Sequence, residues 1–267
     1  MGIIYSVWGN KGSGKTTTAF KIAKQLEAKG KEVIVVIPDQ KCSLDVFVQS
    51  VQKDQSIGKV LSEPIIDQDS IIKNLVPVSK KMMLIGYAEY ENQYTYPAFT
   101  AEAARDFLIL IKNLADYVIV DCESDVLSCK LTATALQMSD KVVRLCSCNL
   151  KAVAFYKSQL NLLIDRKYKA NDHIRVLSNV KEYEPIESIK EYYQSIPYRL
   201  DFCEDVEKQM LTGIWEGSKK TRKYDKTISD IVNKLLNQEV KELDGARNKS
   251  KFSIKFIKNK KPEVVNE

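Results

Sequence analysis

A run of eight residues near the N-terminus has the types and spacing of a phosphate-binding loop. The pattern GxxxxGK[ST] is matched at every position by Gly9, Asn10, Lys11, Gly12, Ser13, Gly14, Lys15 and Thr16. Backbone N–H groups of such a loop, and the N-terminus of the helix that follows it, attract phosphate oxygens. Glycines let the backbone approach closely because they carry no Cβ atom. The pattern therefore predicts a nucleotide site, with ATP and Mg²⁺ as the expected ligands.

Polar side chains in and around this loop are candidates for phosphate and metal binding. Lys15 is expected to reach the β- and γ-phosphates, and the Thr16 hydroxyl to bind Mg²⁺. The metal needs further oxygen ligands. Asp121 is one candidate because it closes the apolar strand YVIV. Asp39, after the strand EVIVVI, is a second candidate that would also orient the attacking water, and its alternative interpretation is a Pro-Asp turn.

The cysteines and the histidine count exclude other kinds of chemistry. The sequence contains six cysteines without a CxxC pair, and His173 is its single histidine. A zinc site would have to come from scattered thiols. A Ser-His or Cys-His catalytic pair is nearly excluded, since His173 lies in the polar stretch KANDH. We expect the cysteines to be buried and reduced.

Hydrophobic periodicity predicts the elements that position these residues. A strand over Ile3–Trp8, a helix over Thr16–Lys29 and a strand over Glu32–Ile37 form a β-α-β unit around the loop, which implies parallel pairing. Further strands are expected over Lys81–Ile85, Tyr117–Val120, Lys141–Cys146 and Ile174–Leu177, and helices over Ala101–Leu114, Leu127–Ser139, Lys151–Asp165, Glu204–Thr212 and Thr227–Gln238. This alternation predicts an α/β fold with a doubly wound, mostly parallel sheet and helices on both faces, as in P-loop NTPases.

The chain of 267 residues is long enough for one α/β domain, which we place at residues 1–238, followed by a basic C-terminal tail at 239–267. The tail segment KFSIKFIKNKK mixes apolar residues with lysines. It fits an edge strand, a disordered arm or a weak membrane-surface anchor, and these interpretations stay open. No apolar run reaches the roughly 20 residues of a membrane span, and the N-terminus lacks signal-peptide features, so we expect a cytoplasmic protein.

Several segments together resemble the MinD/ParA family of P-loop ATPases, over about residues 1–235. The likeness rests on GNKGSGKTTTA, where Thr17 doubles the motif threonine, and on IPDQKCSLD, ADYVIVD, SDKVVRLC, NLKAVAF, RVLSNV and SIPYRLDFCEDVEKQMLTG. The resemblance implies an ATPase that binds Mg²⁺, dimerises on ATP at a surface and hydrolyses slowly. It also implies that Asn179, at the end of RVLSNV, contacts the adenine base.

Two positions depart from the family pattern. The family carries a lysine at the second place of the loop, which reaches the partner's nucleotide; here Asn10 takes that place and Lys11 lies one residue later. Ile37 stands where the family often has an acid, which leaves Asp39 alone. Lys15, Asp39 and Lys11 remain the expected catalytic residues. The departures bear on turnover and on the dimer, whereas ATP binding is expected to persist.

Three functional hypotheses follow. The first is a ParA-like ATPase that positions plasmid or mobile-element DNA, or a surface machine, together with an unidentified partner protein. Non-specific DNA or a membrane would provide its surface, and the basic residues expected to contact DNA are Lys219, Lys220, Arg222 and Lys223, although the same segment fits a solvated loop. The second is a nucleotide-dependent interaction module with little turnover, like the TadZ/CpaE group of positioning factors. The third, a P-loop small-molecule kinase or ligase, ranks lowest because no cluster of polar groups for an acceptor pocket is visible.

Overall fold

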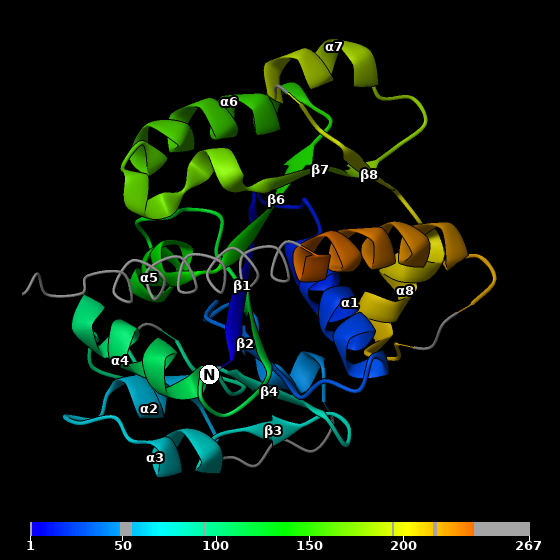
Figure 1. Ribbon diagram of the computed structural model, residues 1–267. Coiled ribbons are helices and arrows are strands. Elements are labelled where there is room, and N and C mark those ends of the chain that lie inside the picture. The colour runs from blue at the N-terminus through cyan, green and yellow to red at the C-terminus, as the bar shows by residue number, and fades with distance from the viewer. Residues whose placement is uncertain (1, 49–54, 93, 194, 216–217, 238–267) are drawn as a thin grey trace, which may run out of the picture. The chain divides into compact units, whose positions relative to one another are not determined.

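The computed structural model describes residues 2–48, 55–92, 94–193, 195–215 and 218–237 (Figure 1). Its contacts divide the chain into two units, Met1–Ser229 and Asp230–Glu267. The described part of the second unit, residues 230–237, is helical. The predicted tail at 239–267 lies outside the described residues, so the domain boundary stays a prediction. The architecture below is that of the first unit.

Eight strands form a single sheet. They are β1 (Ile3–Gly9), β2 (Val33–Ile37), β3 (Val76–Pro77), β4 (Met82–Gly86), β5 (Tyr117–Asp121), β6 (Lys141–Ser147), β7 (Ile174–Val180) and β8 (Tyr198–Asp201). Their order is β3-β4-β2-β5-β1-β6-β7-β8. Every neighbouring pair is parallel except β3 and β4, which are antiparallel. The predicted doubly wound, mostly parallel sheet is confirmed.

Helices cover both faces of this sheet, which explains why most residues of its central strands are apolar. Figure 1 shows α1 (Lys15–Ala28) and α8 (Glu204–Thr212) on one side, and α4 (Ala101–Ile111), α5 (Lys130–Met138) and α6 (Leu150–Leu160) on the other. Strands β2 and β5 are buried at every residue. A strand that is covered on both faces favours a continuous apolar run over an alternating one, and both segments have such a run.

The strand register gathers polar residues at one edge of the sheet. Val7 of β1 lies beside Asp121 of β5, and Gly9 lies beside Leu145 of β6. Because parallel strands end at the same edge, the loop after Gly9 emerges between the ends of β5 and β6. The chain leaves β1 toward β2 on one side and continues from β5 to β6 on the other. Such a reversal opens the crevice in which α/β sheets bind their ligands.

Short elements and several helix ends differ from the sequence predictions. α4 ends at Ile111 rather than Leu114, and α5 begins at Lys130 rather than Leu127. The helix predicted over Lys151–Asp165 ends at Leu160 and continues as the 3₁₀ turn Asn161–Leu163. The elements that periodicity did not predict are α2 (Ile57–Leu61), α3 (Gln68–Lys73), α7 (Ile186–Lys190), β3 and β8. Helices of five or six residues are too short to produce a periodic signal. α2 and α3 begin instead at side-chain caps, Ser56 bonded to the N–H of Gly58 and Asp67 to that of Ser70.

The prediction of buried cysteines is confirmed for four of the six. All six cysteines are free; Cys122, Cys129, Cys146 and Cys148 are buried, whereas Cys42 and Cys203 are half-buried. His173 is also buried, although it lies in the polar stretch KANDH. Its ring bonds the Tyr168 carbonyl oxygen, so a tertiary contact overrides the local polarity. Within the part of the chain that the structure describes, no helix is long and apolar enough to cross a bilayer.

Candidate functional site

Thr16 and Asp121 meet at the carboxyl edge of the sheet. The Thr16 hydroxyl, in the first turn of α1, donates a hydrogen bond of 2.6 Å to Oδ2 of Asp121 at the end of β5. The second carboxylate oxygen, Oδ1, is buried and has no hydrogen-bond partner among the described residues. Burial raises the pKa of Asp121 to about 6, and the bond from Thr16 opposes that shift. Two of the three residues named as metal ligands, Thr16 and Asp121, are therefore in contact, whereas Asp39 makes no bond to either of them among the described residues.

This pair fits a divalent cation. A hydroxyl oxygen and a buried carboxylate with an unsatisfied oxygen are the donor types that Mg²⁺ binds, with phosphate oxygens and water completing its shell. A bound cation would offset the cost of holding this charge in a buried position. No group of three or more His, Cys, Asp or Glu side chains that could hold a metal occurs among the described residues.

Lys15 extends toward the same edge from the start of α1. Its Nζ donates to Oγ of Ser124 at 2.8 Å and to the carbonyl oxygen of Asn10 at 3.5 Å. Desolvation lowers the pKa of Lys15 from its usual value, while the neighbouring Asp121 carboxylate opposes that shift. Among the described residues, this half-buried ammonium group is bonded to neutral oxygens alone, so a phosphate anion would be a stronger partner for it.

The backbone of the loop has the conformation that its glycines predict. Gly12 and Gly14 have φ angles of 78° and 79°, in the left-handed region that costs other residues roughly 1–2 kcal/mol. Gly14 is also the residue that caps the N-terminus of α1, and it does so without a side-chain hydrogen bond. The first N–H groups of α1 are therefore open to a ligand. Gly9 has a different role, since a Cβ atom there would lie 2.3 Å from the Leu145 carbonyl oxygen.

Asn10 fastens the loop to strand β6. Its Nδ2 donates to Oγ of Ser147 at 3.0 Å and to the Lys11 carbonyl oxygen at 2.9 Å, and its Oδ1 accepts from the Ser147 N–H at 3.1 Å. Asn10 is 9% exposed. The side chain at the second place of the loop is thus engaged within its own chain. This partnership could not be read from the sequence, because 137 positions separate Asn10 from Ser147.

The other two catalytic candidates lie differently. Asp39 is close enough to Lys15 and Asp121 to act on both their pKa values. Its Oδ1 also accepts a hydrogen bond from the Lys41 N–H at 2.9 Å, as expected of a turn residue. Both interpretations of Asp39 therefore have support. Lys11 is exposed, and it does not belong to the residues that line the pocket at the loop.

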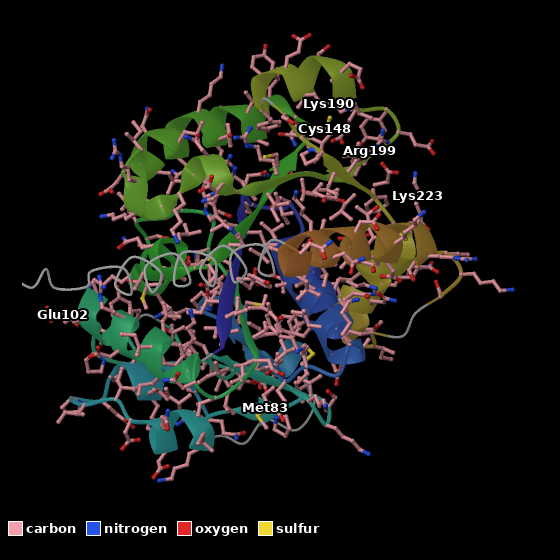
Figure 2. All side chains as sticks on the ribbon, viewed as in Figure 1. Met83, Glu102, Cys148, Lys190, Arg199 and Lys223 are labelled. Atoms are coloured by element: carbon pink, nitrogen blue, oxygen red, sulfur yellow. The ribbon has the colours of Figure 1, made fainter. Side chains whose placement is uncertain are left out.

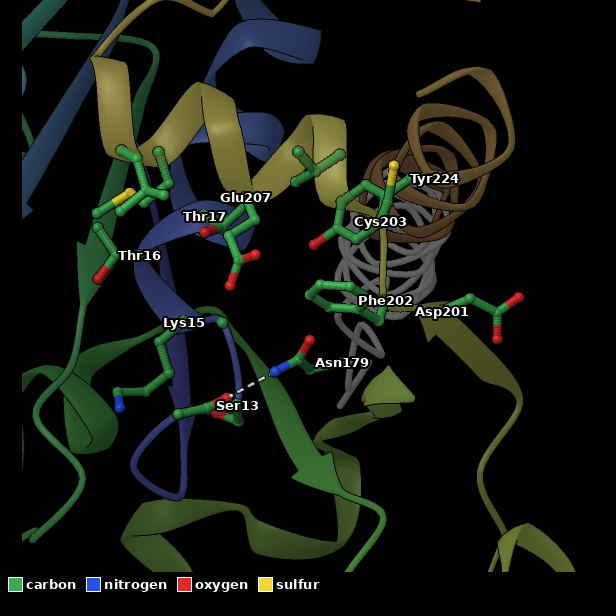
Figure 3. A pocket seen from close by; sticks show the side chains of 15 residues that line it. Ser13, Lys15, Thr16, Thr17, Asn179, Asp201, Phe202, Cys203, Glu207 and Tyr224 are labelled. Carbon is green, nitrogen blue, oxygen red and sulfur yellow. Dashed lines mark hydrogen bonds between the residues drawn. The ribbon is translucent and has the colours of Figure 1, made fainter. Parts of the chain in front are cut away.

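A pocket of about 360 Å³ opens beside the loop (Figure 3). Its lining residues are Gly12, Ser13, Gly14, Lys15, Thr16, Thr17, Asn179, Asp201, Phe202, Cys203, Val206, Glu207, Met210, Leu211 and Tyr224. Asn179 has a positive φ of 55° and its Nδ2 donates to the Gly12 carbonyl oxygen at 3.2 Å. The predicted base-contacting residue therefore lies at the loop, on the wall of this pocket.

The far wall of the pocket contains residues that the sequence analysis did not single out. Phe202 follows β8, Glu207 lies on α8, and Tyr224 lies in the helical segment that begins at residue 222. Asp201 is bonded to Arg199 and to Lys223, the latter at 2.6 Å. Figure 2 labels Arg199 and Lys223, which lie near each other at this side of the molecule. These ion pairs lower the pKa of Asp201, against the effect of its partial burial. The segment SIPYRLDFCEDVEKQMLTG carried a family likeness, but no motif marked its individual residues.

An aromatic stack lies behind the loop. The ring of Phe20, on the buried face of α1, stacks on Phe47 at 4.6 Å and on Trp215 at 4.9 Å between centroids. Phe47 follows the segment that contains Asp39, and Trp215 follows α8. The same helix carries Lys21, whose Nζ pairs with Asp225 at 2.8 Å. The segment after β2 and the segment after α8 are thereby both packed against α1.

Comparison with known proteins agrees with this geometry. A family model described as an AAA domain, AAA_31, matches residues 2–176. No curated protein matches the sequence at a significant level. Similar solved structures include a ParA family ATPase from Chlorobium tepidum TLS (TM-score 0.70, 16% identity, covering 87% of this chain and 99% of that one). MinD from Pyrococcus horikoshii OT3, complexed with Mg-ADP, has a TM-score of 0.69 at 16% identity, covering 88% and 98%. A putative plasmid partition protein from Borrelia burgdorferi B31, bound to AMPPNP, has a TM-score of 0.67 at 17% identity, covering 88% and 99%. The chain therefore belongs to the AAA_31 family and has the fold of the ParA and MinD ATPases, as its sequence motifs predict.

Proposed function

We propose that this protein binds ATP together with Mg²⁺ in the loop between β1 and α1. The observation that carries the proposal is that Lys15, Thr16 and Asp121 lie together at the start of α1, whose first N–H groups are open. The ligands of two similar structures, Mg-ADP and AMPPNP, support the choice of an adenine nucleotide. The cation would neutralise phosphate charge, and Thr16 and Asp121 would hold it.

Different residues of this chain would bind different parts of ATP. The N–H groups of the loop and the Lys15 ammonium would bind the phosphates. Asn179, beside Gly12 of the loop, and Phe202, on the far wall of the pocket, would contact the base, Phe202 by stacking. Asp39 lies near enough to the phosphate end to orient a water molecule for slow hydrolysis.

We further propose that ATP drives formation of a homodimer that positions a cargo, in line with the MinD/ParA resemblance. The cargo would be plasmid or mobile-element DNA, or a surface machine bound through a partner protein. Lys219, Lys220, Arg222 and Lys223 are all exposed, as contact with the DNA backbone requires. Cytoplasmic location remains a prediction from the sequence.

A second candidate, a nucleotide-dependent interaction module with little turnover, is favoured by one observation. The Asn10 side chain is bonded to Ser147 of its own chain, and Lys11 is exposed outside the pocket. The positions of Asn10 and Lys11 therefore do not indicate that either side chain contacts the phosphates in its own subunit. In this interpretation ATP would stabilise one conformation, and the bound state itself would be the signal.

Two measurements test these proposals. Calorimetric titration with AMPPNP and Mg²⁺ should give binding to the wild type and none to Lys15→Ala, because the substitution deletes the charge at the phosphates. Normal binding by Lys15→Ala would show that the site is wrongly assigned. ATP turnover, measured with and without duplex DNA or anionic lipid vesicles, then separates the candidates. Turnover stimulated by a surface supports the positioning ATPase, and binding without turnover supports the interaction module.

A further inference from the structure

Two carboxylates line the pocket, and only one of them is paired. Asp201 is bonded to Arg199 and Lys223. The Glu207 side chain is exposed, and it makes no hydrogen bond or ion pair with any other residue that the structure describes. The charge of Asp201 is thus compensated, whereas that of Glu207 remains available to a ligand.

Glu207 lies at the middle of the pocket. Figure 3 shows its carboxylate directed into the cavity from α8, with Lys15 and Ser13 on one side and Phe202 and Asn179 on the other. The phosphate-binding loop is at the first of these ends and the aromatic ring at the second. A nucleotide that extends from the loop to Phe202 places its sugar between them, which is where the Glu207 carboxylate points.

An unpaired carboxylate is unfavourable beside a polyphosphate unless it meets hydrogen-bond donors, because like charges repel. A carboxylate accepts hydrogen bonds and donates none when it is ionised. The sugar of a ribonucleotide supplies two hydroxyl donors, and bonds to a charged acceptor are stronger than those between neutral groups. Its hydroxyls are therefore the part of the ligand that suits Glu207.

We propose that Glu207 makes this site selective for ribonucleotides by accepting hydrogen bonds from the ribose hydroxyls of the bound nucleotide. This inference rests on the proposed nucleotide binding and specifies which nucleotides bind. A nucleotide without one of these hydroxyls keeps the repulsion from Glu207 and loses the compensating bond. The same carboxylate therefore favours ATP and disfavours its deoxy analogues.

The test compares ATP with 2′-deoxyATP and 3′-deoxyATP by calorimetric titration in the presence of Mg²⁺. The wild type should bind at least one deoxy analogue about 10-fold or more weakly than ATP, which corresponds to about 1.4 kcal/mol. Glu207→Ala should bind ATP about 10-fold more weakly and the affected deoxy analogue equally well or more tightly, so that the preference disappears. Glu207→Gln should keep a reduced preference, because its amide oxygen still accepts a hydrogen bond.

Glu204→Ala is the matched control. Glu204 lies one turn earlier in α8, is exposed and does not line the pocket, so its removal deletes the same charge from the same helix. This variant should retain the wild-type preference. Thermal unfolding without nucleotide establishes that each variant is folded before its affinities are compared.

The outcomes separate this proposal from the one on which it rests. Equal affinity of the wild type for ATP and both deoxy analogues overturns the role of Glu207 while ATP binding stands. A preference that survives unchanged in Glu207→Ala overturns it as well. A wild type that binds none of the three nucleotides overturns the proposed function itself.

Discussion

Replacing His173 with glutamine is expected to make the protein less sensitive to mild acid. His173 is 6% exposed and its Nε2–H donates to the Tyr168 carbonyl oxygen at 2.8 Å. Burial lowers the pKa of His173 to about 4, and the neighbouring guanidinium groups of Arg144 and Arg175 act in the same direction. The folded protein therefore keeps this imidazole neutral at a pH where the unfolded chain protonates it.

The size of the effect follows from the two pKa values. The ordinary pKa is 6.5 and the folded value is about 4, a difference worth roughly 3 kcal/mol at about 1.36 kcal/mol per unit. The unfolded state binds the extra proton below its own pKa, so the free energy of unfolding decreases as the pH falls from 6.5 to 4. About 2 kcal/mol of this is lost between about pH 7 and pH 5. For a domain of this size that loss lowers Tm by about 4–8 °C.

Thermal and urea unfolding of the wild type and His173→Gln between pH 8 and pH 5 measures the effect. Glutamine does not titrate, and its amide can donate to the same carbonyl oxygen. The stability difference between the two proteins should therefore shift by about 2 kcal/mol in favour of glutamine as the pH falls from about 7 to 5. Other titrating groups, such as Asp121, act alike in both proteins and cancel in this comparison.

Since His173 is the only histidine in the sequence, its imidazole proton resonance can be assigned without ambiguity. That resonance should titrate well below the ordinary value of 6.5. Parallel stability profiles for the two proteins, or an imidazole that titrates near its ordinary pKa, would refute the reasoning.

Three further substitutions test the contacts around the loop. Asn10→Ala removes the hydrogen bonds to Ser147 and should lower the stability by about 1–3 kcal/mol in urea unfolding; an unchanged stability would contradict the fastening of the loop. Lys21→Met leaves Asp225 without its cation and should cost about 1–2 kcal/mol, with a coupling that a double-mutant cycle with Asp225→Asn detects. Asp121→Asn should abolish the increase in Tm that Mg²⁺ adds to that of the nucleotide, because an amide is neutral; without ligand at pH 8 it should not lower Tm, since burial raises the pKa of this carboxyl to about 6. A persistent Mg²⁺ effect would place the metal elsewhere.

The sheet and the phosphate end of the pocket were predictable because their signals are local. The loop motif is contiguous, and Asp121 closes an apolar strand whose register with β1 follows from the fold class. The sequence alone therefore assigns Thr16 and Asp121 to one metal site. The structure confirms the fold and shows the two side chains in contact.

The base end of the pocket and the environment of Asn10 were not predictable in the same way. The orientation of the Asn10 side chain depends on its hydrogen bond to Ser147, and the position of Glu207 depends on how α8 lies beside the loop. Both arrangements bring together residues that are far apart in the sequence. Acidic residues are common in the first turn of a helix because the helix dipole stabilises a negative charge there. The residue type alone therefore does not identify Glu207 as a ligand-binding residue. Only the direction of its side chain separates it from Glu204.

The ring of Phe20 bears on how this protein tolerates sequence change. Phe47 and Trp215 rest on opposite sides of one residue, although they belong to segments about 170 positions apart. A substitution at either ring alters the support of the other, so paired changes at these positions should depart from the sum of the single effects. A substitution at Phe47, after β2, is therefore tolerated better when Trp215, after α8, changes to match it. We expect these two positions to vary together among related proteins.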